Sequence, residues 1–311
     1  MTADPHVTEG PTAGVGATTD GADTASGGAR TVGRAELVAD IAEQLGSPLE
    51  ARWIVDHAGP ERARVLAGRR ASGEPLQYVL GQWPFRSIEL SVDPRVLIPR
   101  PETEQVVEVA LAELGRSSSA TGVPGRMPSS VDLGTGSGAI ALSLAVEGGA
   151  VLSALEVWAT DASADALMVA HHNLDALAER DPAAAARVRI VHGSWFDALP
   201  VRLAGRLDLV VSNPPYVAES EYSGLDPVVR DFEPRSALVA EAGADGTGGM
   251  AAIEVIVAEA PGWLRPTGVL VVEISPSRAR ACVDAAHRAG FGQVTTARDL
   301  AGRLRVLVAR R

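Results

Sequence analysis

The most regular feature of the chain is a series of short apolar runs, each ended by turn residues and separated by longer segments with helical spacing. Runs of this kind are typical of strands that are buried on both faces of a parallel sheet. Seven are expected, at 131–133, 155–160, 189–192, 207–212, 269–273, 293–296 and 305–309. Because strands and helices alternate, the pattern predicts an α/β fold with a mainly parallel sheet covered by helices on both faces.

The part of the chain before these strands begins with two segments of different character. Residues 1–30 are rich in glycine, alanine, threonine, aspartate and serine and contain few large apolar side chains. Such a segment buries too little surface to offset the entropy of ordering it, so we predict a disordered tail. Residues 31–82 show helical spacing, with Leu37, Ile41 and Leu45 on one face. They are predicted to form a small helical domain.

Residues 83–128 are interpreted as a linker to the main domain. Polar and apolar positions alternate in residues 87–92, which favours a β-hairpin. A helix follows, and the serine-, glycine- and proline-rich stretch after it, residues 115–128, is predicted to be a loop that leads into the first strand. The remaining residues, 129–311, contain all seven strands and form the predicted main domain.

Composition and charge narrow the class of protein. The chain has 311 residues, enough for one sizeable domain and a small one, and a net charge of −11. A protein that grips a nucleic-acid backbone more often shows a basic patch, so direct nucleic-acid binding is not expected, although a local basic face stays open. The N-terminus lacks the apolar core of a secretory signal, and no apolar run approaches the length of a membrane span. We therefore expect a cytoplasmic protein that does not contact membranes.

Cysteine and histidine usage gives no sign of metal or covalent chemistry. The single cysteine, Cys282, excludes an internal disulfide, and its alanine-rich setting indicates a helix core more than a nucleophile. The six histidines show no spacing typical of a metal site, so no metal is expected. No arrangement of serine or cysteine with histidine indicates a covalent nucleophile.

The most informative motif follows the strand predicted at 207–212 and reads Asn213-Pro214-Pro215-Tyr216. In open α/β sheets, ligands bind at the carboxyl ends of the strands, where this motif lies. The two prolines stiffen the loop and leave its carbonyl oxygens bare beside the Asn213 amide. Such a cradle accepts both N–H groups of a planar –NH2, with the Tyr216 ring packed on the flat group, so the motif favours methyl transfer to a planar nitrogen. A plain turn is the alternative, since asparagine and proline are common in turns.

A second motif is the glycine-rich turn after the strand at 131–133. Its glycines, Gly134, Gly136 and Gly138, let the backbone come close to a ligand. Dinucleotide-binding folds use related turns, but the acid just before this one, Asp132, would repel a pyrophosphate. Asp161 ends the next strand, where an acid typically binds ribose hydroxyls. It would also serve as the cap of the helix that follows.

Taken in order, these motifs resemble those of class I methyltransferases that use S-adenosylmethionine (SAM). Three further segments are Leu97-Ile98-Pro99-Arg100-Pro101-Glu102-Thr103-Glu104, Asp231-Phe232-Glu233-Pro234-Arg235 and Asp299-Leu300-Ala301-Gly302-Arg303. With them, the chain resembles the HemK family, the methyltransferases that modify the glutamine of the Gly-Gly-Gln loop in peptide chain release factors. The resemblance runs from about Gly73 to the C-terminus, with a weaker helical match before it. It implies a Rossmann-like, seven-stranded sheet whose last strand is antiparallel.

The resemblance also implies roles for individual residues. SAM would lie against Gly134, Thr135, Gly136, Ser137, Gly138, Asp161, Trp195 and Asn213. Catalysis would involve Asn213, Pro214 and Tyr216, and the substrate glutamine would contact Asn213, Pro214, Pro215 and Tyr216. Trp195 is alternatively a core aromatic residue, and Ser194 stands where many methyltransferases carry an acid for the adenine amino group. The helical domain would help to dock the release factor, although it is shorter than the family's by about one helix.

Two other functions stay open from the sequence. An adenine amino group is also a planar –NH2, so an adenine methyltransferase that acts on nucleic acid is the first alternative. The acidic net charge and the absence of an appended recognition module argue against it. The second is a binding or scaffold protein that keeps the SAM fold without activity, and the intact glycine and Asn-Pro-Pro-Tyr motifs argue against that.

Overall fold

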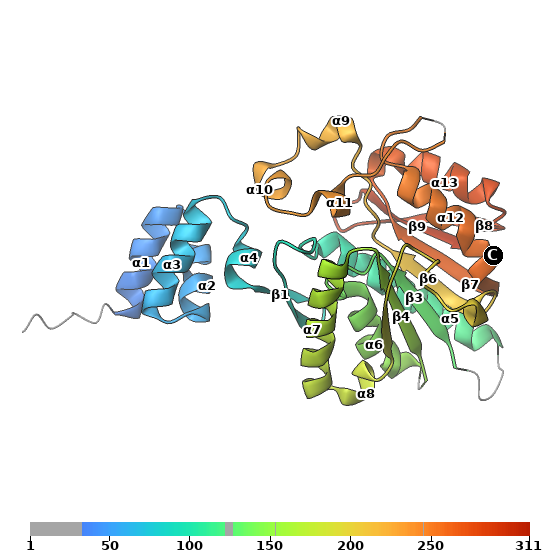
Figure 1. Ribbon diagram of the computed structural model, residues 1–311, viewed down its shortest axis with the longest axis horizontal. Coiled ribbons are helices and arrows are strands. Elements are labelled where there is room, and N and C mark those ends of the chain that lie inside the picture. The colour runs from blue at the N-terminus through green and yellow to red at the C-terminus, as the bar shows by residue number, and fades with distance from the viewer. Residues whose placement is uncertain (1–32, 122–126, 153, 245) are drawn as a thin grey trace, which may run out of the picture.

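The computed structural model describes residues 33–121, 127–152, 154–244 and 246–311. Figure 1 shows a group of helices at one end of the molecule and a larger body built around a sheet at the other. The tail predicted at 1–30 lies outside the described residues.

The helical group is formed by α1 (Arg34–Leu45), α2 (Pro48–His57) and α3 (Pro60–Ala71), followed by the short α4 (Leu76–Leu80). It has an apolar core of its own, separate from the two cores of the sheet body. The break after α1 follows from the sequence, because Gly46 adopts a left-handed φ of 66° and Ser47 caps α2 by accepting from the Glu50 N–H. The predicted helical pattern is confirmed.

A hairpin and a long helix connect this group to the sheet. Strands β1 (Gln82–Phe85) and β2 (Ile88–Ser91) pair antiparallel, as the alternation predicted. Helix α5 runs over Pro101–Thr121, so the prediction of a loop from residue 115 was wrong for 115–121. Once a helix is anchored by buried side chains, as α5 is through Val107 and Leu114, each added residue needs only one more hydrogen bond to continue it.

Seven strands form one sheet in the order β5-β4-β3-β6-β7-β9-β8. They are β3 (Ser129–Leu133), β4 (Glu156–Asp161), β5 (Val188–His192), β6 (Leu207–Ser212), β7 (Leu264–Glu273), β8 (Gln293–Arg298) and β9 (Leu304–Arg310). All seven predicted strands are confirmed. The last strand, β9, is antiparallel to both of its neighbours, and the other pairs are parallel.

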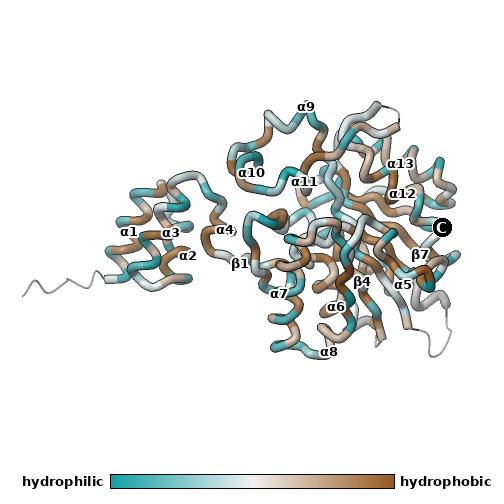
Figure 2. Tube along the Cα trace, viewed as in Figure 1, coloured by the Kyte–Doolittle hydropathy of each residue, from teal (hydrophilic) through white to brown (hydrophobic). Residues whose placement is uncertain are grey.

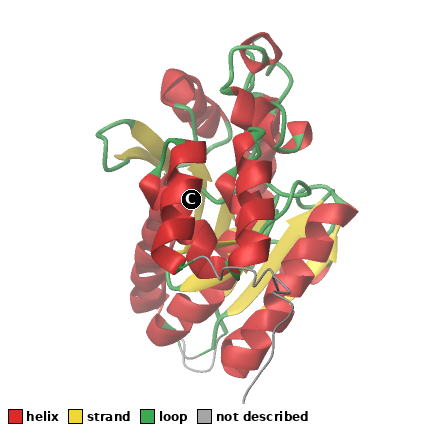
Figure 3. Ribbon diagram, turned by 90° about the vertical axis from the view of Figure 1, so that its left-hand side faces the viewer, coloured by secondary structure: helices red, strands yellow, loops and turns green. Residues whose placement is uncertain are grey.

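Helices bury both faces of the sheet. Along β6, Leu209 and Val211 belong to one apolar core and Val210 to the other, because successive side chains of a strand point to opposite faces. Helices α5, α6 (Ala139–Val151) and α7 (Ala164–Arg180) pack on the first face, and α12 (Ala251–Trp263) and α13 (Ala279–Arg288) on the second (Figures 1 and 3). The sheet between them contains apolar stretches, as in β7 (Figure 2). Within the described residues, no helix is long and apolar enough to cross a bilayer.

The remaining helices are short and lie in the connections. They are α8 (Pro182–Ala185), η1 (Val201–Leu203), α9 (Glu219–Tyr222), α10 (Pro227–Arg230), α11 (Arg235–Leu238) and η2 (Pro276–Arg278). Three of them, α9 to α11, belong to the long connection between β6 and α12. Its ends are held together because Val217 exchanges backbone hydrogen bonds with Leu238 and Ala240.

The order of the strands places a crevice beside β3. One neighbour of β3 is β4 and the other is β6, so the connections from this point run in opposite directions along the sheet. The loops after these strands therefore diverge at the carboxyl edge. In doubly wound sheets this is where ligands bind.

Candidate active site

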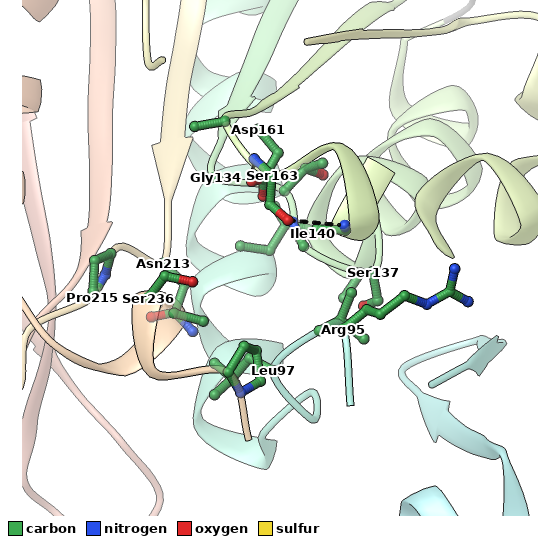
Figure 4. Close-up of a pocket in the computed structure, with 18 of the residues that line it drawn as sticks. Arg95, Leu97, Gly134, Ser137, Ile140, Asp161, Ser163, Asn213, Pro215 and Ser236 are labelled. Carbon is green, nitrogen blue, oxygen red and sulfur yellow. Dashed lines mark hydrogen bonds between the residues drawn. The ribbon is translucent and has the colours of Figure 1, made fainter. Parts of the chain in front are cut away.

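A pocket of about 450 Å³ lies at the carboxyl ends of β3, β4 and β6. Most of the residues predicted as site residues line it: Gly134, Thr135, Gly136, Ser137, Asp161, Trp195, Asn213 and Pro215. Asn213 and Pro215 lie on one side of the pocket, and Gly134, Asp161 and Ser163 lie across it (Figure 4). Two motifs that are about 80 residues apart in the chain therefore face one cavity.

The glycine turn brings backbone to the pocket wall because its residues adopt left-handed conformations. Gly134, Gly136 and Gly138 have φ angles of 72°, 56° and 87°. The N–H groups of Gly134 and Thr135 both donate to the carbonyl of Thr160, at 2.8 and 2.9 Å, which ties the turn to the end of β4. Gly138 does not line the pocket; it leads into α6.

Asp132 supports this turn from beneath instead of facing the pocket. Its side chain is fully buried, and one carboxylate oxygen accepts from the Thr135 hydroxyl at 2.6 Å and from the Ala141 N–H at 3.2 Å. Burial raises the pKa of Asp132 to about 7. The acid therefore fixes the turn, and its charge is sensitive to pH near neutrality.

Asp161 both lines the pocket and braces the turn. Its carboxylate accepts from the N–H of Gly136 and from that of Ser163, each at 2.9 Å. The interpretation of Asp161 as the cap of the next helix was wrong, because Ser163 is the cap of α7 and accepts from the Ala166 N–H. A carboxylate has lone pairs beyond the two used here, which leaves it able to accept from ligand hydroxyls.

Trp195 lies between the pocket and the core of the sheet body. It lines the pocket together with Ser194 and also packs against the core under α12 and α13. Its backbone has a φ of 42°, and its carbonyl accepts from the Thr160 hydroxyl at 3.2 Å. A Cβ at Gly134 would come within 3.3 Å of the Trp195 ring, so the glycine there makes room for the indole.

The four residues after β6 point in different directions. Asn213 and Pro215 line the pocket, whereas Pro214 is buried and Tyr216 does not belong to the lining. The Tyr216 ring packs against the core, and its hydroxyl donates to Glu273 at 3.1 Å. The direct contacts of Pro214 and Tyr216 with substrate stay predictions.

Behind Asn213 lies a hydrogen-bonded set that the sequence analysis did not assign. The Asn213 Nδ2 donates to the Thr103 hydroxyl at 3.1 Å, and Thr103 donates to Glu273 at 2.7 Å. Glu273 is buried at the end of β7, and burial raises its pKa. Thr103 belongs to one of the segments that resemble the family, and that segment was the only signal for it in the sequence.

The wall opposite the glycine turn is built from two distant segments. Leu97 and Pro99 line it together with Pro234, Ser236 and Ala237. The two segments are joined by the buried Glu233 carboxylate, which accepts from the Ile98 N–H at 3.2 Å and pairs with Arg100. The short helix α4 reaches the same wall, since the Tyr78 hydroxyl donates to the Val96 carbonyl at 2.5 Å. The helical group is thereby connected to the pocket.

Comparison with known proteins assigns the family. The methyltransferase small domain family matches residues 124–230. A release factor glutamine methyltransferase of Nitratidesulfovibrio vulgaris is 43% identical over 266 residues, which cover 83% of this chain and 80% of that protein. The chain belongs to the release factor glutamine methyltransferase family.

A second relative gives the same result. A release factor glutamine methyltransferase of Bordetella pertussis is 40% identical over 287 residues, covering 86% of this chain and 96% of its own length. The crystal structure of a protein-(glutamine-N5) methyltransferase (release factor-specific) from Alicyclobacillus acidocaldarius is 26% identical, with a TM-score of 0.37, and the match covers 71% of this chain and 98% of that one.

Membership in this family makes the chain an enzyme that transfers methyl groups, and its sheet is the Rossmann-like, seven-stranded sheet of class I methyltransferases. The expected resemblance and fold class are confirmed. Among the described residues, no group of three or more acidic, histidine or cysteine side chains is arranged to hold a metal ion.

Proposed function

We propose that this enzyme transfers a methyl group from SAM to the side-chain amide nitrogen of the glutamine in the Gly-Gly-Gln loop of peptide chain release factors. The observation that carries the proposal is the single pocket in which Asn213 and Pro215 face the glycine turn and Asp161. One side of this pocket suits a planar amide and the other suits a nucleoside.

The residues on the turn side fit SAM. Asp161 is placed to accept hydrogen bonds from ribose hydroxyls, and the Trp195 ring offers an apolar surface for the adenine. The Ser194 hydroxyl replaces the usual acid as acceptor for the adenine amino group. A pocket of about 450 Å³ is also within the range of pockets that bind small molecules. When bound, SAM supplies the methyl group on a sulfonium, which is the electrophile.

The residues on the other side meet the main difficulty of the reaction, which is the weak nucleophilicity of an amide. Its nitrogen lone pair is delocalised into the carbonyl, the resonance that gives a peptide C–N bond its rotation barrier of ~18–20 kcal/mol. The Asn213 side-chain oxygen and the Pro214 carbonyl accept the two N–H groups, which fixes the amide plane and raises electron density on nitrogen. A nitrogen–carbon bond forms as the sulfur–carbon bond breaks. The methylated amide is then strongly acidic and releases one proton to solvent.

The same proposal gives each part of the chain a task. Residues 31–82 form a docking domain for the release factor, 83–128 connect it, and 129–311 carry the methyltransferase site, while the tail of residues 1–30 takes no part. The contact between Tyr78 and Val96 supports this division, because it joins the helical group directly to the pocket wall. The enzyme acts in the cytoplasm, where release factors work, and does not bind nucleic acid directly.

Mass spectrometry of a purified release factor, incubated with the enzyme and SAM, tests the proposal. We expect one added methyl group, which fragment spectra place on the loop glutamine. A release factor with that glutamine changed to glutamate should gain none. An unmodified loop glutamine after incubation with active enzyme would contradict the proposed substrate.

A further inference from the structure

Four side chains from three segments form one series of hydrogen bonds behind the pocket. Asn213, after β6, donates to Thr103 of α5, and Thr103 donates to the Glu273 carboxylate at the end of β7. The other oxygen of Glu273 accepts from Tyr216, in the segment that follows Asn213. Arg305 of β9 lies close enough to favour the charged form of this carboxylate, whereas Glu102 of α5 opposes it.

The direction of these hydrogen bonds is determined at the carboxylate. Arg305 and the two hydroxyls that donate to Glu273 favour its ionised form against the effect of burial, and an ionised carboxylate only accepts, so the single hydroxyl hydrogen of Thr103 is directed to Glu273. The Thr103 oxygen then offers only lone pairs to Asn213, and a side-chain amide can meet lone pairs only with its –NH2 group. The amide of Asn213 is therefore held with Nδ2 toward Thr103. Its oxygen is left for the pocket, and no hydrogen-bond partner for that oxygen is found among the described residues.

We propose that Thr103 and Glu273 are positioning residues that hold the Asn213 amide with its oxygen toward the substrate, and that this orientation makes the site selective for an amide over a carboxylate. The inference rests on the proposed function. An oxygen at this position accepts from the –NH2 of glutamine. It would repel a glutamate carboxylate, because both groups are acceptors and neither has a hydrogen to donate. With the Asn213 amide turned over, its –NH2 would instead favour the carboxylate.

Burial of these hydrogen-bonded side chains stabilises the orientation of the Asn213 amide. Thr103 and Glu273 are 4% and 1% exposed, so water does not compete for their hydrogen bonds. Rotation of the Asn213 amide would bring two acceptors together at Thr103, and a buried polar group without a partner is costly. A purely structural role of Glu273 predicts that its substitution changes the stability of the fold but leaves kcat and substrate selectivity unchanged. This difference separates a positioning role from a structural one.

The test compares two nearly isosteric substitutions with a conservative one. Thr103→Val removes the hydroxyl, and Glu273→Gln removes the charge that fixes the direction of the hydrogen bonds. For both variants we expect kcat for the release factor to fall at least about tenfold, while the Kd for SAM changes little. The fall is smaller than the 10²–10³ typical of a lost preorganised donor or acceptor, because Asn213 itself is still present. Thr103→Ser keeps the hydroxyl and should restore most of kcat. Ser143→Ala, which deletes a buried hydroxyl with no hydrogen-bond partner among the described residues, is the matched control.

A selectivity measurement completes the test. A release factor whose loop glutamine is replaced by glutamate is used as an inhibitor, and its inhibition constant should decrease in Thr103→Val and Glu273→Gln relative to wild type. If either variant unfolds, as monitored by its Tm, the other decides. Folded variants that keep the wild-type kcat and the wild-type selectivity would overturn the inference. Failure of the wild-type enzyme to methylate the release factor would instead overturn the proposed function, so the two failures are distinguishable.

Discussion

At the scale of single residues, the pocket depends on two acids with different tasks. Asp132 is fully buried beneath the glycine turn, whereas Asp161 lines the pocket and accepts from two backbone N–H groups of the surrounding loops. We expect the first to act on stability and, under the proposed function, the second to act on ligand binding, so the two can be tested by separate measurements.

Asp161→Ala should weaken SAM binding. It removes charge-assisted hydrogen bonds to the cofactor worth roughly 1.5–3 kcal/mol, which corresponds to about a ten- to hundredfold higher Kd. Isothermal titration calorimetry measures this directly. Asp165→Ala removes an exposed carboxylate from the first turn of α7, outside the pocket lining, and serves as a charge-matched control. An unchanged Kd in Asp161→Ala would contradict the assignment of that residue.

Asp132→Asn should change how stability depends on pH. Burial raises the pKa of Asp132 from 3.8 to about 7, so between these values the folded protein holds a proton that the unfolded chain has released. Stability from this group is therefore lost as pH rises through that range, by up to about 1.4 kcal/mol per pH unit, and the asparagine variant lacks this loss. Urea denaturation of both proteins without ligand, at about pH 5 and about pH 7.5, measures the difference. A difference that does not vary with pH would rule out the effect.

The sequence identified residues that line the pocket more readily than the residues that hold those side chains in place. Asn213 and Asp161 were assigned because each follows a recognisable strand, and the pocket contains both. Thr103 and Glu273 are 170 positions apart, and only the folded sheet brings the end of β7 against α5. Neither lies in a local pattern that distinguishes such a contact from an ordinary helix start or strand end.

At the scale of elements, the loop that contains Gly248 and Gly249 and precedes α12 packs against the Asn-Pro-Pro-Tyr segment. Gly249 has a φ of 75°, and a Cβ there would clash with the Tyr216 carbonyl oxygen. Arg278 holds the same loop by donating to the Gly248 carbonyl at 2.6 Å. The position of Tyr216 therefore depends on a glycine more than 30 residues away.

Gly249→Ala should lower both the Tm and kcat. An alanine with positive φ costs roughly 1–2 kcal/mol, and the clash with Tyr216 adds to this cost and displaces the segment that holds Asn213. Gly246→Ala is the matched control, because Gly246 has a φ of 83° and open space around its Cβ position. The Tm of both variants should fall, but only Gly249→Ala should lose kcat. Equal effects of the two variants on kcat would argue against a link between this loop and the site.

The elements themselves could be predicted because parallel strands are buried on both faces and so appear as continuous apolar runs. Each of the seven runs became a strand. The end of α5 could not be predicted in the same way. Its residues from 115 onward are mostly glycine, serine and threonine, which are poor helix formers, and they continue a helix already anchored at Val107 and Leu114. Local composition indicates helix propensity alone. Here the tertiary contacts of the earlier part of α5 outweighed the low propensity of its end.

At the scale of the whole molecule, the proposal separates a docking domain, a catalytic body and a tail. If the tail takes no part in docking, deleting residues 1–30 should leave kcat and KM for the release factor nearly unchanged. Steady-state kinetics of the truncated and complete chains provide the measurement. A large rise in KM after the deletion would mean that the tail binds substrate.

Transfer of a tritiated methyl group from SAM, measured with release factor and with DNA under the same conditions, distinguishes the proposed protein substrate from a nucleic-acid substrate. We predict label on the release factor, none on a release factor whose loop glutamine is changed to glutamate, and none on DNA. With Asn213→Ala, which removes one of the two acceptors for the amide, kcat should fall by about 10²–10³ while SAM affinity falls much less. Label on DNA adenine, with none on the release factor glutamine, would contradict the account.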